Sequence, residues 1–535
     1  YVNAPLSDTL SVRVAAEHRG LGDWQRSYTR TDSRGQRDFN NGRVSVLWKP
    51  STQFRALLTA SGWTDRGDVQ ATQLSFRLPS APASVAAYPL APADARAADW
   101  NAGTPFRRSN KYRQMSLRMD YDVSDAITVT SLTNYLKVNV DLFIDPDGTA
   151  ITSTHNSQRG TSESFAQELR VAGKFDRLNV LGGVSYSNDI THDRLASIIN
   201  VSSAQAGLGF NQLDGVTNQN VKNYAVFGNA EFKVTDQLTL QGGARYTQSN
   251  NDGTTCLGLD PGDGTVSAGL NAIQNFLRSL LTTPANPLPP LAAVGPGRCG
   301  AINLVTLTQQ DTLLPLRLHE HNVSWRAGVQ FEPSRATLLY ANVSKGYKQG
   351  TLPLFGGIAT DEAVPVSQES VIAYEAGFKQ SFADRKIQLN GAVYYSDYKN
   401  KQVLGFIPVP VLGSSAGLVN IPKSRIWGAE LQAVLRPTDG LILTAACSYT
   451  DAKISGNYTA PDALGVTRNF RGTVLPYAPK WQLSASARYE WPLHENLKGF
   501  LGANVAYQSL SYGNIGSDKI LEIKPYSTTD LQLGA

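Results

Sequence analysis

The chain has 535 residues, of which 17% are charged and 41% are hydrophobic, and this balance argues against disorder as its dominant state. It contains 46 glycines and 22 tyrosines but only two methionines, a mixture that favours strands and turns over packed helices. The net charge of +5 is small, so nucleic-acid binding is not expected. No apolar run approaches the roughly 18 residues of a spanning helix, which excludes a helical membrane protein.

Short polar turns recur from one end of the chain to the other, and each joins two strand-like runs. They are Pro5–Asp8, Pro50–Thr52, Ser124–Asp125, Asp176–Arg177, Thr235–Asp236, Pro333–Ser334, Asp384–Arg385, Pro437–Gly440 and Pro492–Asn496. Much longer segments alternate with these turns, at Gly20–Asp38, Thr64–Asn110, Asp141–Gly160, Asp193–Asn218, Asn250–Arg317, Thr351–Pro365, Gln402–Pro422, Asp451–Leu475 and Ser511–Ile523. Short connections at one end and long ones at the other are typical of a transmembrane β-barrel, whereas a soluble sandwich lacks this asymmetry.

The runs between the turns alternate apolar and polar residues with period two. In one run, Leu238, Leu240 and Tyr246 alternate with Thr239 and Arg245. Tyrosine and tryptophan recur near the ends of the runs, as in the aromatic girdles at membrane interfaces. We therefore expect an all-β fold, a large antiparallel transmembrane barrel of about nineteen strands of roughly ten residues, with short periplasmic turns and long extracellular loops.

A barrel of this size encloses a lumen that its own side chains cannot fill, so the lumen must hold water, a plug or a ligand. Charged residues on the parity predicted to face inward could contact a plug or a substrate. These lumen-facing candidates are Arg118, Glu168, Arg170, Arg245, Arg326, Glu375, Lys379, Glu430 and Arg488. Any single one of them is more simply interpreted as a solvated part of the lumen wall.

Several segments resemble the barrel domain of TonB-dependent outer-membrane transporters. Three are moderately specific, at Asn3–Arg13, Glu163–Ala172 and Tyr224–Phe232. Three are more specific: LYANVSKGYKQG at Leu339–Gly350, YEAGFK at Tyr374–Lys379 and NIPKSRIWGAELQ at Asn420–Gln432. The resemblance spans nearly the whole chain, and the segments follow one another in the order of the family.

The resemblance implies a barrel of about 22 strands, of which residues 1–535 would supply the second to about the twentieth. We therefore expect a partial barrel domain, without the N-terminal plug and the last strands. The family also implies the outer membrane of a Gram-negative bacterium as the location, with lipid and lipopolysaccharide around a monomeric barrel. Its further partners would be a small-molecule ligand and the TonB complex, which would act through the missing plug segment.

Cys256 and Cys299 both fall in the longest predicted outer loop, in a compartment that permits disulfides. We expect these two cysteines to pair. The residues with helical spacing between them are Leu270, Ile273, Phe276, Leu277 and Leu280. A short amphipathic helix there could be a lid over the substrate, but a helix that only packs within its loop is the favoured interpretation.

Two further segments offer weaker candidates. His319 and His321 share one face near the outer rim, but no third ligand is visible, so no metal site is expected. The uncharged segment Gln402–Pro422 could offer apolar contact to a ligand. The interpretation that we favour is that its two ends extend the neighbouring strands above the membrane.

No arrangement of Ser, His and Asp, no phosphate loop and no paired-carboxylate pattern stands out, so we expect no enzymatic activity, no catalytic residue and no cofactor. The remaining cysteine, Cys447, shares parity with Leu441, Leu443 and Tyr449. It is expected to face lipid, where a catalytic thiol is implausible.

The leading functional hypothesis is a gated transporter that takes up a scarce nutrient, and the resemblance implies a ferric siderophore or similar metal chelate most often. A passive porin is the second hypothesis, because the lumen wall is charged and no plug is visible. A surface β-protein that binds glycans is the third, because the composition is rich in tyrosine and glycine. No feature separates a metal chelate from cobalamin, an oligosaccharide or an aromatic substrate.

Overall fold

Nineteen strands form one antiparallel sheet in the computed structural model of the chain. The structure describes residues 1–77, 81–200, 212–259, 265–282, 294–303, 309–310, 312–353, 360, 363–409, 413–462, 465–495 and 497–535. The sheet and its strand number confirm the all-β expectation.

The strands of this sheet are the barrel wall. They are β1 (Val2–Pro5), β2 (Leu10–Leu21), β5 (Arg37–Trp48), β6 (Phe54–Gly67), β8 (Arg107–Ser124), β9 (Ile127–Ile144), β10 (Thr154–Lys174), β11 (Leu178–Ile199), β12 (Gln212–Lys233), β13 (Leu238–Leu257), β16 (Leu314–Ser334), β17 (Thr337–Lys348), β18 (Glu369–Phe382), β19 (Ile387–Val409), β20 (Gly413–Leu435), β21 (Leu441–Ile454), β24 (Trp481–His494), β25 (Leu497–Gln508) and β28 (Tyr526–Gly534). Each wall strand pairs with the next one along the chain.

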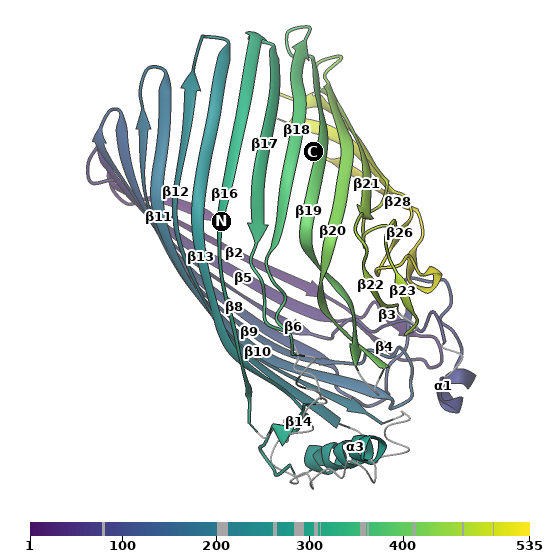
Figure 1. Cartoon of the computed structure of the whole chain (residues 1–535). Helices are drawn as coiled ribbons and strands as arrows, with labels where there is room; N and C mark the ends of the chain where they lie inside the picture. Colours follow the sequence, from purple (N-terminus) through teal and green to yellow (C-terminus); the bar gives the residue numbers. More distant parts are fainter. Residues whose placement is uncertain are drawn as a thin grey trace.

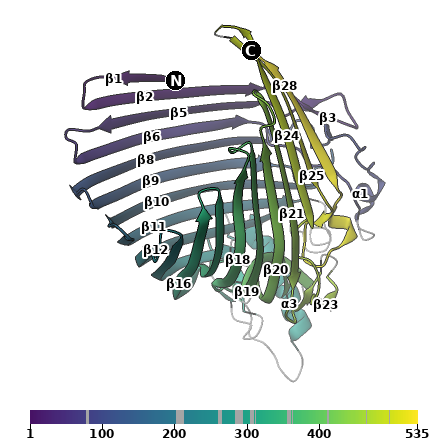
Figure 2. The ribbon, with the colours of Figure 1, turned by 90° about the horizontal axis from the view of Figure 1, so that it is seen from above.

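The sheet curls around an axis, as expected for a meander in which successive strands twist relative to one another. Figure 1 shows the tilted strands from the side, and Figure 2 shows them from above. In the view from above, the two ends of the chain lie on the same side of the curled sheet (Figure 2).

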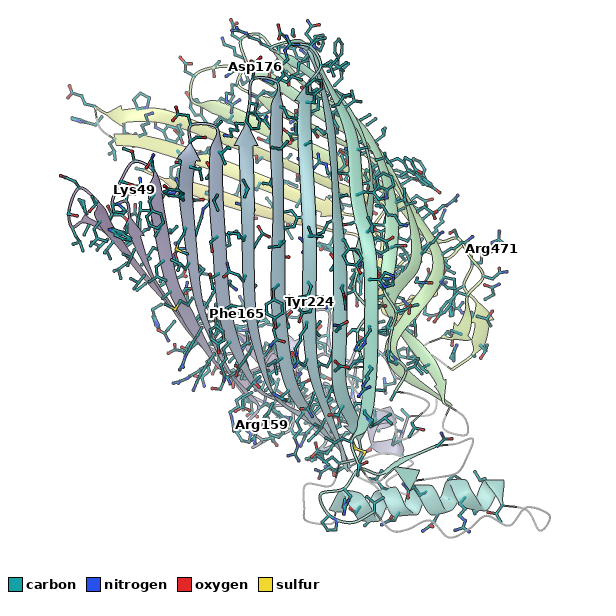
Figure 3. The ribbon with its side chains drawn as sticks, turned by 60° about the vertical axis from the view of Figure 1, so that its left-hand side comes forward. Lys49, Arg159, Phe165, Asp176, Tyr224 and Arg471 are labelled. Atoms are coloured by element: carbon teal, nitrogen blue, oxygen red, sulfur yellow. A yellow bond between two sulfur atoms is a disulfide. The ribbon has the colours of Figure 1, made fainter. Side chains whose placement is uncertain are left out.

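The two ends of the wall differ in the length of their connections. Short turns close one end, for example between Trp48 and Phe54 and between Lys174 and Leu178. Figure 3 shows Lys49 and Asp176 at this turn end, with the long connections at the opposite end. The turns fall where the sequence predicts them, to within about two residues, except that residue 496 of the last predicted turn lies outside the described residues.

The strands are longer than predicted. We expect roughly ten residues from the thickness of a bilayer, but β19 and β20 each have 23 residues. Because a strand rises about 3.3 Å per residue, such strands continue well beyond the hydrocarbon layer at the loop end. Much of Asp141–Gly160, Asp193–Asn218 and Gln402–Pro422 is therefore strand, and for the last segment the favoured interpretation is confirmed.

Short elements fill the long connections. They are β3 (Gln25–Ser27), β4 (Ser33–Arg34), α1 (Ala83–Ala87), β7 (Ala97–Ala98), α3 (Thr265–Leu281), β14 (Ala301–Ile302), β15 (Gln309–Gln310), β22 (Thr459–Pro461), β23 (Thr467–Asn469), β26 (Ser511–Tyr512), a 3₁₀ turn (Lys519–Leu521) and β27 (Glu522–Ile523). Among the described residues, no helix combines the length and apolarity needed to cross a membrane.

The long connections fold into two compact assemblies with cores of their own. The first, here the N-terminal loop assembly, has a buried cluster made of Val69, Ala71, Ala98, Trp100 and Phe106, against which Leu142, Phe143 and Ile144 pack. The second, the C-terminal loop assembly, has a buried cluster made of Ile421, Ala452, Ile454, Ala460, Phe470, Leu475 and Ile515. Both clusters combine segments that are far apart in sequence.

Helix α3 and the cysteine pair form a third unit at the loop end. Cys256 and Cys299 lie side by side with their sulfurs bonded at 2.03 Å. Leu270 of α3 is fully buried against Gly258 and Gly300, where a Cβ would come within 2.8 Å and 2.4 Å of the leucine side chain. These two glycines allow the helix to approach the cysteine-linked backbone closely.

Candidate functional site

The ladder register places all nine lumen-facing candidates on one face of the sheet. Residues directly opposite across neighbouring strands point to the same face, so the face can be followed from strand to strand. Arg118 lies opposite Leu132, and Leu132 lies opposite Glu168. The same cross-strand pairs can be followed along the remaining strands. They lead to Arg245, which lies opposite Phe227, and finally to Arg488, which lies opposite Ile442.

The side chains on this face are apart from one another along the wall, and several are held by local partners. Asp120 joins Arg118 and Arg55, each with an N···O distance of 2.8 Å. Glu168 and Arg170 lie 3.5 Å apart. The structure therefore brings together neighbouring candidates such as these but does not gather the nine into one cluster.

Three more of the candidates have partners on the same strand, on the next strand or on the strand after it. Arg245 donates to the Ser185 hydroxyl at 2.9 Å. Arg326 donates to Gln241 Oε1 at 2.7 Å. Arg488 donates to Glu490 at 2.8 Å, so much of the charge along this wall is fixed by neighbours.

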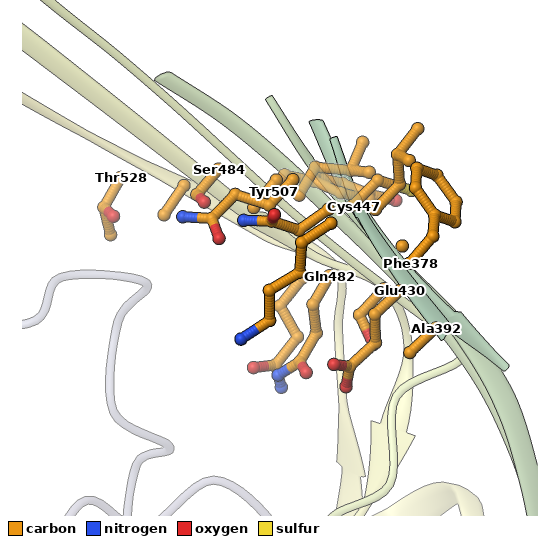
Figure 4. Close-up of a pocket in the computed structure, with 18 of the residues that line it drawn as sticks. Phe378, Ala392, Glu430, Cys447, Gln482, Ser484, Tyr507 and Thr528 are labelled. Carbon is orange, nitrogen blue, oxygen red and sulfur yellow. The ribbon is translucent and has the colours of Figure 1, made fainter. Parts of the chain in front are cut away.

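A hollow of about 680 Å³ lies on this face, across strands β17 to β28. Two of the nine candidates, Lys379 and Glu430, line it. The other inward side chains of the hollow are neutral: Tyr340, Asn390, Ala392, Gln432, Ala446, Ser448, Gln482, Ser484, Ala506, Gln508, Tyr526 and Thr528. Figure 4 shows Glu430 and Gln482 projecting to one side of the strands and Phe378 to the other.

The neutral residues of this hollow are not among the lumen-facing candidates predicted from the sequence, because those candidates were chosen for their charged side chains. Parity alone could have found them, since Gln482 and Ser484 share the parity of Arg488. Cys447 lies opposite Leu431 and Leu483 and thus on the outward, apolar face with them.

The outward face of the wall is apolar and exposed. Leu240 is 47% exposed and Tyr224 is 46% exposed. A continuous apolar surface with this exposure would be unfavourable in water. Figure 3 shows Phe165 and Tyr224 partway along this wall. An apolar outer band and a polar inner face are the two surfaces that a membrane barrel needs.

A buried acidic site lies in the N-terminal loop assembly. Asp99 is fully buried and accepts hydrogen bonds from Ser27 at 2.9 Å, Tyr88 at 2.5 Å and Thr29. Arg30 Nη1 lies 3.1 Å from its carboxylate. Burial, followed by the hydrogen bond with Asp99, raises the pKa of Tyr88. The site links two long connections, the one between β2 and β5 and the one between β6 and β8.

Asp145 occupies a neighbouring buried position. Its carboxylate accepts a hydrogen bond from the Asn101 amide at 2.9 Å and from the Asp147 amide at 3.3 Å. Burial raises its pKa to about 7, although these amides and the charge of Arg34 act in the opposite direction. The carboxyl group therefore titrates near neutral pH inside a folded loop.

The rim histidines do not form a metal site. His319 Nε2 lies 3.1 Å from Asp252 Oδ1, whereas Glu320 accepts hydrogen bonds from the Gly350 and Gln368 amides at 2.8 Å and 2.7 Å. Within the described ranges, no group of three or more His, Cys, Asp or Glu side chains could hold a metal ion.

A curled meander with turns at one end, folded loops at the other, an apolar outside and a polar inside defines a transmembrane barrel. Residues 54–535 match the family described as "TonB dependent receptor-like, beta-barrel". The chain belongs to this family, whose members are outer-membrane transporters of Gram-negative bacteria and not enzymes.

Solved structures of the same fold include two receptors. The ferric yersiniabactin uptake receptor FyuA from Yersinia pestis superposes with a TM-score of 0.70 at 15% identity, over 99% of this chain and 69% of that one. The siderophore receptor PiuA from Acinetobacter baumannii also gives a TM-score of 0.70, at 17% identity, over 99% of this chain and 71% of that one. At such identities the likeness shows the fold alone.

A curated relative is similar to this chain in sequence. It is the "Probable TonB-dependent siderophore receptor PiuA" of Acinetobacter baumannii strain ATCC 19606, 22% identical over 435 residues. The match covers 76% of this chain and 52% of the relative, so the chain spans about half the length of the curated relative.

Proposed function

We propose that this barrel takes up a metal chelate, most readily a ferric siderophore, across the outer membrane in a TonB-dependent step. The observation that carries the proposal is family membership over residues 54–535. The choice of ligand class rests on the similar proteins, which include receptors for siderophores. It also agrees with the polar, charged inner face.

The proposal also assigns separate roles to the barrel, the plug domain and the TonB complex. Residues 1–535 supply the barrel wall and the loops, and a plug domain occupies the lumen against the inner face. The nine lumen-facing candidates, among them Arg118, Lys379 and Glu430, contact the plug or the substrate. The TonB complex acts on the plug, and the barrel works as a monomer.

The loop assemblies support capture of a ligand from outside. Their buried cores give them defined shapes at the outer end of the lumen, which favours a preorganised binding surface over a mobile one. The cysteine-linked unit with helix α3 adds a third ordered element at the same end.

Transport is tested in iron-starved cells that produce the native protein or lack it. Uptake of ⁵⁵Fe is measured with a panel of catecholate, hydroxamate and citrate chelates, with radiolabelled cobalamin and a maltodextrin as other ligand classes. We expect uptake of at least one ferric chelate that requires the protein and stops when a protonophore removes the proton gradient. Uptake of cobalamin or maltodextrin instead would contradict the ligand class.

The same assay separates gated transport from a passive porin. A porin predicts that uptake persists with the protonophore and that the native protein gives steady conductance in planar bilayers. A matched pair of variants then tests the inner face: Glu430→Gln should slow chelate uptake, whereas Cys447→Ser on the outward face should not. Equal uptake by both variants would remove Glu430 from the proposed contact surface.

A further inference from the structure

Two tyrosines on the inner face of the wall lie across the neighbouring strand instead of standing upright in the lumen. Tyr394 of β19 is opposite Gly428 of β20, and Tyr340 of β17 is opposite Gly377 of β18. Both tyrosines face inward, because Tyr394 is also opposite the lumen-facing Glu375 and Tyr340 lines the hollow of about 680 Å³. Both side chains are half-buried.

The glycines leave the space that the two rings occupy. A Cβ on Gly428 would come within 2.5 Å of the Tyr394 hydroxyl oxygen and within 2.6 Å of its Cζ. On Gly377 the corresponding distances to Tyr340 are 2.6 Å and 2.7 Å. A backbone carbonyl crowds each position as well, so even alanine would strain the wall there. Each ring therefore crosses the next strand directly over a glycine, which permits this close approach.

The far end of the Tyr394 ring is fixed on a third strand. Its hydroxyl lies 3.0 Å from the Thr450 hydroxyl of β21, within hydrogen-bond distance, and Thr450 is opposite Gly428. Tyr394, Gly428 and Thr450 therefore form one row across β19, β20 and β21, which we call the tyrosine row. Without the hydrogen bond, the ring would be free to rotate about χ1 into the lumen.

The tyrosine row lies at the loop-side edge of the hollow. Ala392, Glu430 and Ser448 line the hollow and form the row next to it; Ala392 and Glu430 are labelled in Figure 4. Tyr394 and Thr450 stand two residues closer to the loops than Ala392 and Ser448, a rise of roughly 7 Å along the strand. A ligand that enters from the loop end passes the tyrosine row before it reaches the hollow.

The position of the Tyr394 ring decides how much room the ligand has at this edge. A ring that lies flat over a glycine adds little thickness to the wall, whereas a ring that stands upright narrows the lumen by its own length. Ala392 and Ser448, in the row below, have small side chains. The width of the passage at this edge therefore depends on the ring.

We propose that Tyr394, tied flat to Thr450 across Gly428, sets the size of the largest chelate that can pass from the loop end into the hollow. Tyr340, flat over Gly377, keeps the next row open in the same way. The inference rests on the proposed function, because it concerns the passage of a chelate through the lumen. The tyrosine row admits a bulky chelate while the ring is flat and excludes it when the ring stands upright.

The test uses cells that produce the full native protein or a variant of it, with two probes. One probe is a ferric chelate that the native protein takes up, and the other is the bulkiest dye conjugate of that chelate that the native protein still takes up. The ratio of the two uptake rates, conjugate over parent, reports the width of the passage. In Thr450→Val we expect this ratio to fall about fivefold, the factor by which one ordinary hydrogen bond shifts a two-state equilibrium. Binding of both probes at the cell surface should not change.

Three further variants separate size exclusion from a general structural effect. Thr450→Ser keeps the hydroxyl and should retain the native ratio. Tyr394→Leu in the Thr450→Val background removes the ring and should restore the ratio. Thr444→Val removes a hydroxyl from the same face of β21, opposite Val434 and Ser486, and should leave the ratio unchanged. A difference in electrophoretic migration between heated and unheated samples, which reports a folded barrel, is checked for every variant.

The position of the ring is also measured directly, in a crystal structure of the Thr450→Val protein. We expect the Tyr394 ring to leave Gly428. A ring that stays flat, an unchanged ratio in Thr450→Val, or an equal fall of the ratio in Thr444→Val would overturn the inference. Failure of the native protein to take up any ferric chelate would overturn the proposed function instead, and the crystal structure would still decide whether Thr450 holds Tyr394 against the wall.

Discussion

The barrel wall and the loop assemblies are stabilised in different ways, although the same strands run from one into the other. In the wall, Leu240 and other outward apolar side chains are about half exposed, and the continuous backbone ladder holds the strands together. At the loop end, side chains such as Phe106 and Phe470 are 1% exposed. Within the described residues, the largest fully buried apolar side chains belong to the loops or to the strand ends beside them: Phe106, Phe470, Leu270, Leu352, Ile421 and Ile454.

This difference means that the loop ends fold as a water-soluble protein does, by burying apolar surface. The wall instead depends on lipid to cover its apolar face and on backbone pairing within the bilayer. A substitution in a loop core should therefore disorder the outer end while the barrel persists. A substitution on the lipid face should weaken the barrel itself.

The largest effect is expected in a loop core. Phe470→Ala should destabilise the C-terminal loop assembly by about 3 to 5 kcal/mol, because it leaves a cavity where Tyr458 and Arg468 now pack on the ring. Native-state hydrogen exchange over residues 454–475 measures the local free energy of opening. Val466 lies in the same loop but is 59% exposed, so Val466→Ala should change this free energy of opening little. An equal loss of stability in the two variants would mean that the loop has no core.

The second effect tests the two faces of one wall strand. Leu240→Arg should cost about 2 to 4 kcal/mol, because a charge at mid-membrane must leave water. Its neighbour Thr239 has the opposite parity, so Thr239→Arg should be far milder. Denaturant unfolding of the barrel in lipid vesicles gives both free energies, and similar costs at the two positions would reverse or abolish the face assignment.

These faces and turns could be predicted from the sequence because both depend on local patterns. Alternation with period two places Leu240 and Arg245 on opposite faces whatever the rest of the chain does. Turn residues such as Asp384 and Arg385 mark the hairpin directly; both have positive φ, 53° and 67°. The length of the strands could not be predicted in this way, because the alternation of apolar and polar residues continues beyond the bilayer without any change in pattern.

The loop cores could not be predicted, because they join segments that are distant in sequence. Gln25 hydrogen-bonds both the amide and the carbonyl of Ala71 at 2.8 Å and 2.9 Å, across 46 positions. Asp99 likewise depends on hydroxyls that no local motif connects to it. On the inner wall, charge identified Lys379 and Glu430, but neutral Gln482 carries no signal apart from its parity.

The cysteine-linked unit tests whether a covalent bond or packing holds the loop. Cys256→Ala with Cys299→Ala should destabilise this unit by about 2 kcal/mol, the lower end of the usual range for a disulfide. The effect stays moderate because Leu270 remains buried and Gln274 still donates to the Gly300 carbonyl at 3.1 Å. Non-reducing peptide mapping first establishes the bond in the native protein. Limited proteolysis with and without reductant then measures the opening, and an unlinked native pair would rule out the disulfide.

The last effect concerns Asp145 and the pH dependence of the N-terminal loop assembly. Its pKa is raised to about 7 in the folded loop by burial, so between pH 4 and 7 the folded form holds a proton that the opened form has released. The opened form binds fewer protons, and stability must therefore fall as pH rises through this window and level off above it.

Asp145→Asn keeps an oxygen that can accept from the Asn101 amide but cannot ionise. We expect the variant to lose the pH dependence and to be more stable than the native loop at pH 8, while matching it at pH 4. Hydrogen exchange in residues 97–106, corrected for intrinsic rates at each pH, measures the difference. Since Leu240 lies in the wall, Leu240→Arg should leave this pH profile unchanged; a parallel change would mean that wall and loops open as one unit.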